Sequence, residues 1–305
     1  MLKLDSNMLS AIAGIADIPT GAYNIRKNGE AFGRQSTDNV DIIPKTDKPG
    51  IDIKIKPFTK AEKVHIPVII TESGVNDLVY NDFYIGEGAD VEIVAGCGIH
   101  NCGDEKSQHD GIHAFHIGKN AHLKYVEKHY GEGDGNGERV LNPTTIIYLA
   151  QGASAEMETV QIRGVDSTKR DTKAFLEKDA KLLMTERLMT HGNQFAQSDM
   201  EIDMNGENSS CRIISRSVGK DDSVQNFHPI VRGNAACKAH VQCDSIIMGN
   251  SKIASIPQID ANHGDAQLVH EAAIGKINSD QLLKLMTFGL DEETAEEVIV
   301  EGFLK

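Results

Sequence analysis

Apolar and polar residues alternate in short stretches through most of the middle of the chain. One phrase recurs there: a turn, then a small residue, then an alternating stretch. It occupies residues 86–94, 118–126, 152–160 and, without the leading glycine, 178–186. A period of two is typical of β-strands. The first three copies begin at residues 86, 118 and 152, too far apart for simple hairpins. Further short strands are predicted at residues 144–149, 200–204, 211–215 and 238–243.

Repeated strands with almost no helical pattern between them predict a mainly β fold. Such strands can stack as the coils of a parallel β-helix, in which each coil buries its apolar face against the next. A β-sandwich is the alternative. The sequence has no tryptophan and only 5% aromatic residues, which suits a narrow core filled by Val, Ile, Leu and Met.

Helical patterns are confined to the two ends of the chain. Polar capping residues precede an apolar run that stops at Gly289, and a second run with acidic residues in its first turn begins at Asp291. This pattern predicts a helical hairpin. A short helix is predicted at residues 7–14. We therefore expect an N-terminal helical or irregular region (1–49), a β-helix core (50–264) and a C-terminal helical region (265–305).

The charge and the apolar content exclude two classes of partner. The net charge is −14, so nucleic acid and anionic membrane surfaces are repelled. No run of residues approaches the length of a membrane span, and the N-terminus is a poor secretory signal. We therefore expect a cytoplasmic protein. Its five cysteines, an odd number, then argue for reduced thiols rather than structural disulfides.

Two motifs resemble known functional signatures but lack the context that these require. His109 and His113 match the spacing of a zinc protease, which needs a helix, yet the alternating residues around them and Gly111 between them predict a strand. The glycine-rich stretch at 131–137 lacks the Gly-Lys-Ser/Thr ending of a phosphate-binding loop, and its acidic residues would repel phosphate. It is predicted to connect two strands, and any ATP hydrolysis is expected to come from a partner.

Cysteine and histidine occur together at two places. Cys97 and Cys102 flank His100, while Cys237 and Cys243 bracket His240. Thiolates and imidazoles are ligands that iron and zinc prefer. Neither set contains a CxxC pair, so the alternative, in which each cysteine is a small buried apolar residue, stays open.

His270 and Glu271 stand side by side between the strand region and the terminal helices. From residue type alone they could be a general acid/base pair, a pair of metal ligands, or a polar edge with a capping role.

The stretch "IPQIDANHGDAQLVHEAAIGKINSDQLLKLMTFGLDEETAEEVIVEGF" (256–303) resembles the SufB/SufD scaffold proteins of iron-sulfur cluster assembly. The matching features are a proline-containing strand end, an Ala-x-Leu-x-His-Glu-Ala element, an Asp/Glu-Gln-Leu helix start and a Gly-Leu helical hairpin. The segment "SRSVGKDDSVQNFHPIVRGNAACKAHVQCDSIIM" (215–248) is also similar to the family. The resemblance covers most of the chain beyond residue 80.

This resemblance implies a right-handed parallel β-helix with helical ends and a scaffold rather than an enzyme. It also implies a dimer, either a homodimer or a SufB/SufD-like heterodimer. The partners would be an ABC-type ATPase, SufC, bound through the C-terminal helical part, and a protein that donates sulfur as persulfide. The implied cargo is a transient iron-sulfur cluster, and Glu271 matches a SufB glutamate implicated in holding it, with His270 beside it.

The chain also departs from the family pattern. The SufB cysteine that accepts sulfur is expected just before the proline-containing strand end, where this chain has Ser251 to Ser255 and no thiol. Cys237 and Cys243 are therefore the candidate thiol ligands, together with Glu271 and His270, in a compact, SufD-like or minimal-system member. Two alternatives remain, a purely structural SufD-like partner and a β-helix carbohydrate-active enzyme. The lack of tryptophan argues against the enzyme.

Overall fold

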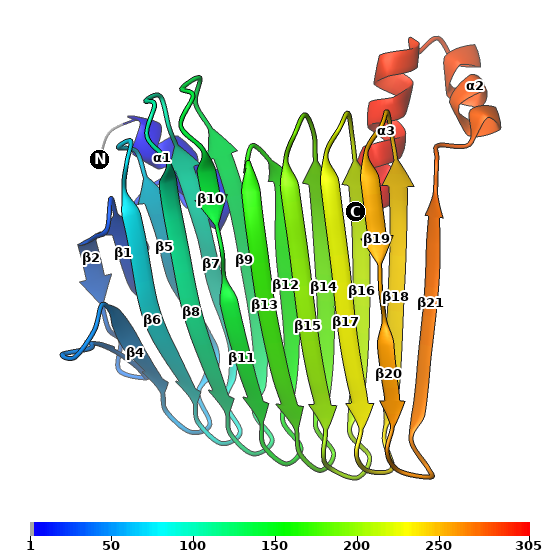
Figure 1. Cartoon of the computed structure of the whole chain (residues 1–305). Coiled ribbons are helices and arrows are strands. Elements are labelled where there is room, and N and C mark those ends of the chain that lie inside the picture. Colours follow the sequence, from blue (N-terminus) through cyan, green and yellow to red (C-terminus); the bar gives the residue numbers. More distant parts are fainter. Residues whose placement is uncertain (1–2) are drawn as a thin grey trace.

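The computed structural model describes residues 3–305, and its strands form two sheets that run along a stack of coils (Figure 1). The ten-stranded sheet contains, in spatial order, β2 (Glu30–Gln35), β1 (Ala22–Lys27), β5 (Lys60–Ile70), β7 (Asp90–His100), β9 (His122–Glu132), β12 (Ser154–Arg163), β14 (Lys181–Thr190), β16 (Ser210–Gly219), β18 (Lys238–Ile247) and β21 (Gln267–Gly275). The eleven-stranded sheet contains β19 (Lys252–Ser255), β17 (Val224–Gly233), β15 (Phe195–Met204), β13 (Ser167–Leu176), β10 (Arg139–Leu141), β8 (Ser107–Ile117), β6 (Asn76–Ile85), β4 (Gly50–Ile55) and β3 (Val40–Pro44). Beside this path, β11 (Thr144–Leu149) pairs with β8 and β13, and β20 (Gln258–Ala261) pairs with β17.

Strands on neighbouring coils pair in parallel, which confirms the prediction of a mainly β, parallel β-helix fold. Within the described chain, antiparallel pairing occurs only at the N-terminal end, between β1 and β2 and between β3 and β4. The short helix expected near the start is present as α1 (Lys3–Ala13). Three strands, β1 to β3, lie in the region that was expected to be helical or irregular. The sequence did not predict them because polar turns interrupt their short alternating stretches.

A column of small buried residues explains the repeat seen in the sequence. The residue before each of the six successive strands from β7 to β18 is small and at most 2% exposed, in the order Ala89, Ala121, Ala153, Ala180, Ser209 and Cys237. The sequence pattern had aligned Ala155 with Ala121. The structure instead pairs Ser154 with His122, which shifts the third copy by two residues. A shift of two leaves every side chain on its face, so the alternation alone could not detect it.

The turns before these strands use residues that tolerate a left-handed backbone. Asn120 has φ 53°, Gly152 has φ 68° and Asp179 has φ 60°. Asparagine, aspartate and glycine adopt this conformation at the least cost. Asp179 therefore performs in the fourth copy of the repeat the role that glycine or asparagine performs in the others.

Helix α1 closes one side of the first coils. Met8, Leu9 and Ile12 are buried on it and pack near β5, β7 and β9. Gly96 on β7 allows this approach, because a Cβ there would lie 2.8 Å from the backbone oxygens of both Ile12 and Lys128. The helix therefore lies against a patch of sheet that has no side chain.

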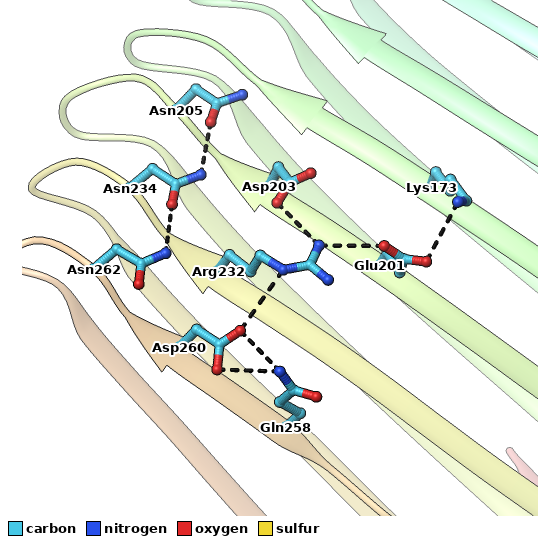
Figure 2. A network of polar contacts seen from close by, with 9 residues as sticks. All are labelled: Lys173, Glu201, Asp203, Asn205, Arg232, Asn234, Gln258, Asp260 and Asn262. Atoms are coloured by element: carbon cyan, nitrogen blue, oxygen red, sulfur yellow. Dashed lines mark hydrogen bonds and ion pairs between the residues drawn. The ribbon is translucent and has the colours of Figure 1, made fainter.

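Polar ladders join the coils on the outside of the eleven-stranded sheet (Figure 2). Asn234 donates to Asn205 at 2.8 Å, and Asn262 donates to Asn234 at 2.8 Å, one coil after another. Beside them Arg232 lies 3.2 Å from both Glu201 and Asp203. The remaining members of the network are Lys173, which pairs with Glu201, and Asp260, which pairs with Arg232 and Gln258. Each such exposed ion pair contributes about 0–1 kcal/mol, so the ladders support register more than stability.

The C-terminal end of the stack is open. Strand β21 is the last strand of its sheet and, within residues 3–305, pairs only with β18, as its isolated position in Figure 1 shows. This strand continues the sheet to Gly275, beyond the boundary at residue 264 that the sequence suggested. The predicted helical hairpin follows as α2 (Ser279–Thr287) and α3 (Glu292–Leu304). Among residues 3–305, no helix has the length and apolar character needed to cross a bilayer.

Candidate functional site

The four predicted site residues lie on or next to β18 and β21, the last two strands of the ten-stranded sheet. Strands β18 and β21 pair in parallel, with Val241 opposite His270 and Gln242 opposite Glu271. Val241 is buried in the interior of the β-helix, whereas Gln242 lies on the outer face. Because neighbouring side chains along a strand point to opposite faces, His270 points inward and Glu271 points outward.

The inward-pointing histidine contacts a thiol of the preceding coil. Cys243 Sγ lies 3.5 Å from His270 Nε2. Cys243 is 3% exposed, and His270 is partly exposed because no further coil covers β21. A thiol and an imidazole therefore meet at the open end of the interior.

The outward-pointing glutamate contacts a different histidine. Glu271 Oε1 accepts a hydrogen bond of 2.5 Å from His240 Nε2 across β18 and β21. The sequence placed His240 between the two cysteines but did not include it among the site residues. The register of the repeat was the signal that could have revealed it, since residues one coil apart become neighbours.

Cys237 lies apart from the other three residues. It stands in the turn before β18, six positions along the extended chain from Cys243, a distance of about 20 Å. Its thiol packs over Gly233, where a Cβ would lie 3.1 Å from Sγ. Cys237 also occupies the column of small residues that includes Ala180 and Ser209. These contacts account for Cys237 as a packing residue.

Burial keeps both thiols protonated near neutral pH. Burial raises the pKa of Cys243 to about 11, and it also raises the pKa of Cys237. Burial lowers the pKa of His270, so its imidazole is held neutral with a lone pair available. Iron can bind Cys243 only by displacing the thiol proton, which makes binding stronger as pH rises.

One described chain does not form a closed metal site. Within residues 3–305, no group of three or more His, Cys, Asp and Glu side chains is arranged to hold a metal ion. The Cys243–His270 pair and the His240–Glu271 pair lie on opposite faces of the same free edge. Ser251, where a thiol was sought, is buried, and its hydroxyl donates to the Gly219 carbonyl at 2.8 Å.

The two histidines of the protease-like motif lie on β8 and not on a helix, as the alternation predicted. His109 and His113 both point into the interior, where His109 Nδ1 lies 3.1 Å from Asp77 and His113 Nδ1 lies 3.1 Å from the Tyr125 hydroxyl. They are core residues with polar partners.

A stack of parallel coils that ends in a free edge strand defines a β-solenoid protein, and the edge strand of this one carries His270 and Glu271. The family model described as "SUF system FeS cluster assembly, SufBD core domain" matches residues 73–303. The chain therefore belongs to the SufBD family of iron-sulfur cluster assembly proteins.

Relatives in archaea and in a plant have similar sequences over most of this chain. An iron-sulfur cluster assembly SufBD family protein of Methanocaldococcus jannaschii is 29% identical over 93% of this chain and 90% of its own length. A protein of the same description from Archaeoglobus fulgidus is 29% identical over 92% of this chain and 73% of its own length. A chloroplastic SufBD family protein of Arabidopsis thaliana is 27% identical over 72% of this chain and 41% of its own length.

Proposed function

We propose that this protein is a scaffold that assembles a nascent iron-sulfur cluster and passes it to other proteins. The contact between Cys243 and His270 at the open end of the β-helix is the observation that carries this proposal. A thiolate binds iron firmly, whereas an imidazole or carboxylate binds it less tightly. Mixed ligation therefore suits a cluster that has to be released.

The remaining ligands come from the free edge and from a second chain. Glu271 lies on the outer face of β21, the strand that carries His270, and His240 lies beside it on the outer face of β18. A free edge strand presents unpaired backbone groups and is usually covered. Val269 and Ile274 on β21 are 55% and 43% exposed, so the edge offers apolar contact as well. A second copy, or a SufB/SufD-like paralogue, covers this edge and brings its own thiol and imidazole to it.

The ATPase binds to the C-terminal hairpin. Helix α3 is anchored to the stack through Val300 and Leu304, which pack near Val218. Helix α2 has no buried residue; Leu283 on the helix and Phe288 at its C-cap are exposed. An amphipathic helix held out in this way is suited to lie in the groove of a partner. The partner that we propose for this protein is an ABC-type ATPase of the SufC kind, and this ATPase carries out the ATP hydrolysis.

Sulfur arrives from a donor protein as persulfide, and the whole process takes place in a reducing compartment. All five cysteines are free. Reduced thiols of this kind are typical of the cytoplasm, which is the location we propose.

Anaerobic reconstitution with ferrous iron and inorganic sulfide tests the scaffold. Wild type is expected to give the visible absorbance and Mössbauer spectrum of an iron-sulfur cluster, and His270→Ala and Glu271→Ala are expected to hold less iron. His263→Ala, at an exposed turn histidine near the same end, serves as the matched control and should behave as wild type. Equal clusters in all variants would exclude this site.

A purely structural role is the second candidate. It is favoured by the absence, among residues 3–305, of a three-ligand group and by the protonated state of both buried thiols. A wild-type protein that binds its ATPase but never holds iron, alone or in the complex, would establish that role.

A further inference from the structure

A second cluster of reactive side chains lies several coils away from the C-terminal edge, where the neighbouring strands β7 and β9 end. Cys102 Sγ lies 3.0 Å from His100 Nε2, and His100 Nδ1 lies 3.2 Å from Glu132 Oε1. His100 and Glu132 are opposite each other in the parallel pairing of β7 and β9. The register of the coils therefore sets the imidazole against the carboxylate.

A chain of hydrogen bonds fixes the orientation of the imidazole. Glu132 accepts from His100 Nδ1, which places the lone pair of the neutral ring on Nε2, facing the thiol. The other oxygen of Glu132 accepts from the Tyr130 hydroxyl at 2.9 Å, and the Arg163 guanidinium lies 5.9 Å from the centre of the Tyr130 ring. A nucleophile, a base and a group that orients the base are the three parts of a nucleophilic centre.

Cys102 is also the accessible thiol of this protein. It is exposed, whereas Cys97, Cys211, Cys237 and Cys243 are buried. The loop that carries it is held by Asn101, whose side chain donates to the carbonyls of Glu105 and Gly137. An exposed thiol on a fixed loop can be reached by a partner molecule without rearrangement of the fold.

The surroundings favour attack on sulfur over attack on a carbonyl. Acyl transfer needs free donors for an oxyanion, but the amides of Gly103, Gly135 and Gly137 already donate to Asn101 Oδ1, Asn101 O and Gly103 O. Asp134 also lies beside Cys102, and the proximity of that thiol lowers the pKa of Asp134. The negative charge of Asp134 opposes an oxyanion and a free thiolate alike, so Cys102 has to pass its proton to His100 as the new S–S bond forms.

We propose that Cys102, His100 and Glu132 form a thiol centre that takes the outer sulfur atom of a persulfide. The persulfide as substrate rests on the proposed function of the chain in cluster assembly. His100 Nε2 takes the proton of Cys102 as Sγ attacks the outer sulfur of R–S–SH. A bond forms between Sγ and that sulfur, the donor S–S bond breaks, and the departing R–S⁻ receives the proton from His100. The products are Cys102–S–SH and R–SH, with no net oxidation.

The test uses glutathione persulfide and the whole protein, without iron. After the reaction, iodoacetamide traps the products, and mass spectrometry locates the extra sulfur. Wild type should carry it on Cys102, Cys102→Ser should carry none, and His100→Gln should react at least about tenfold more slowly. His122→Gln, which removes a partly exposed histidine from the same strand as Glu132, is the matched control and should react as wild type.

Glu132 is a positioning residue, and the pH profile tests its role. Glu132→Gln removes the charge that stabilises the protonated imidazole, so the pH for half-maximal alkylation of Cys102 by iodoacetamide should move upward. An unchanged pH profile of alkylation would show that Glu132 does not act on the imidazole of His100. Equal rates of sulfur transfer in His100→Gln and wild type, or extra sulfur only on a buried cysteine, would overturn the proposal as a whole.

The sulfur-transfer experiment and the cluster experiment test separate claims, so either one can fail without the other. A wild-type protein that forms the Cys102 persulfide but never holds a cluster would overturn only the scaffold function. A wild-type protein that forms a cluster from iron and inorganic sulfide, yet reacts with persulfide no faster than His100→Gln, would overturn only this inference.

Discussion

Cys243 and His270 meet at the open end of the β-helix interior, with Sγ 3.5 Å from Nε2. The two residues are brought together by the register of β18 and β21, one coil apart, and not by proximity in the sequence. If this pair holds iron, the two candidate thiols should behave differently on substitution.

We expect Cys243→Ala to lose most of the iron bound after reconstitution and Cys237→Ala to keep it. Cys237→Ala should also cost less than about 1 kcal/mol of unfolding free energy, because alanine already fills the equivalent position at residues 121, 153 and 180. Iron and sulfide content per chain and urea unfolding are the measurements. Loss of iron in Cys237→Ala alone would reverse the assignment of the thiol ligand.

Gly96 should not tolerate a side chain. A Cβ at this position would lie 2.8 Å from the backbone oxygens of Ile12 and Lys128, neither of which can turn away. Gly96→Ala is therefore expected to lower the unfolding free energy by about 1–3 kcal/mol and to loosen α1. Gly264→Ala is the control, since a Cβ there meets nothing within 4 Å. Equal stability of the two variants would show that α1 does not pack as described.

The sequence predicted the strands and helices because each depends on local pattern. Alternation predicted β8 in place of a protease helix, and the capping residues Asn278 and Asp291 accept the hydrogen bonds from Asp280 N and Thr294 N that begin α2 and α3. Local pattern fixes the face on which a side chain lies, but not which coil it meets.

The candidate sites depended on register, which the pattern did not determine. The repeat could be shifted by two residues without changing the face of any side chain, and the third copy was in fact misplaced by that amount. His270 and Glu271 were treated as one pair, although they point to opposite faces. His100 and Glu132 are 32 residues apart, which is the spacing between the first two copies of the repeat, and this spacing could have predicted their contact.

The stability of the fold should fall as pH drops from about 6.5 to about 4, because of His113. Burial lowers the pKa of His113 from 6.5 to about 4, although the charge of Glu127 opposes this shift. Between these values the unfolded chain binds a proton that the folded chain does not, so stability decreases as pH falls. The full shift corresponds to a loss of about 3 kcal/mol.

His113→Gln should flatten this pH dependence, as measured by urea unfolding at a fixed protein concentration between pH 7 and pH 4. Part of the slope should remain, because burial also lowers the pKa of His65 and His270. His116→Gln, on the outer face of the same strand, should keep the wild-type slope. A wild-type slope in His113→Gln would mean that the buried imidazole is not held neutral.

The free edge of β21 should be the dimer interface. Val269 is 55% exposed on this strand, and a lysine on an edge strand opposes pairing with another edge because its charge would be buried there. We expect Val269→Lys to shift the protein from dimer to monomer at micromolar concentration, as measured by sedimentation velocity. Val298→Lys is the matched control, since Val298 is 46% exposed on α3, which is not part of the sheet, and this variant should stay dimeric. Cluster content should fall together with the dimer in Val269→Lys, because the proposed site needs ligands from both chains. A monomeric variant that still holds the wild-type cluster would place all the ligands within one chain, and an unchanged dimer would place the interface on another surface.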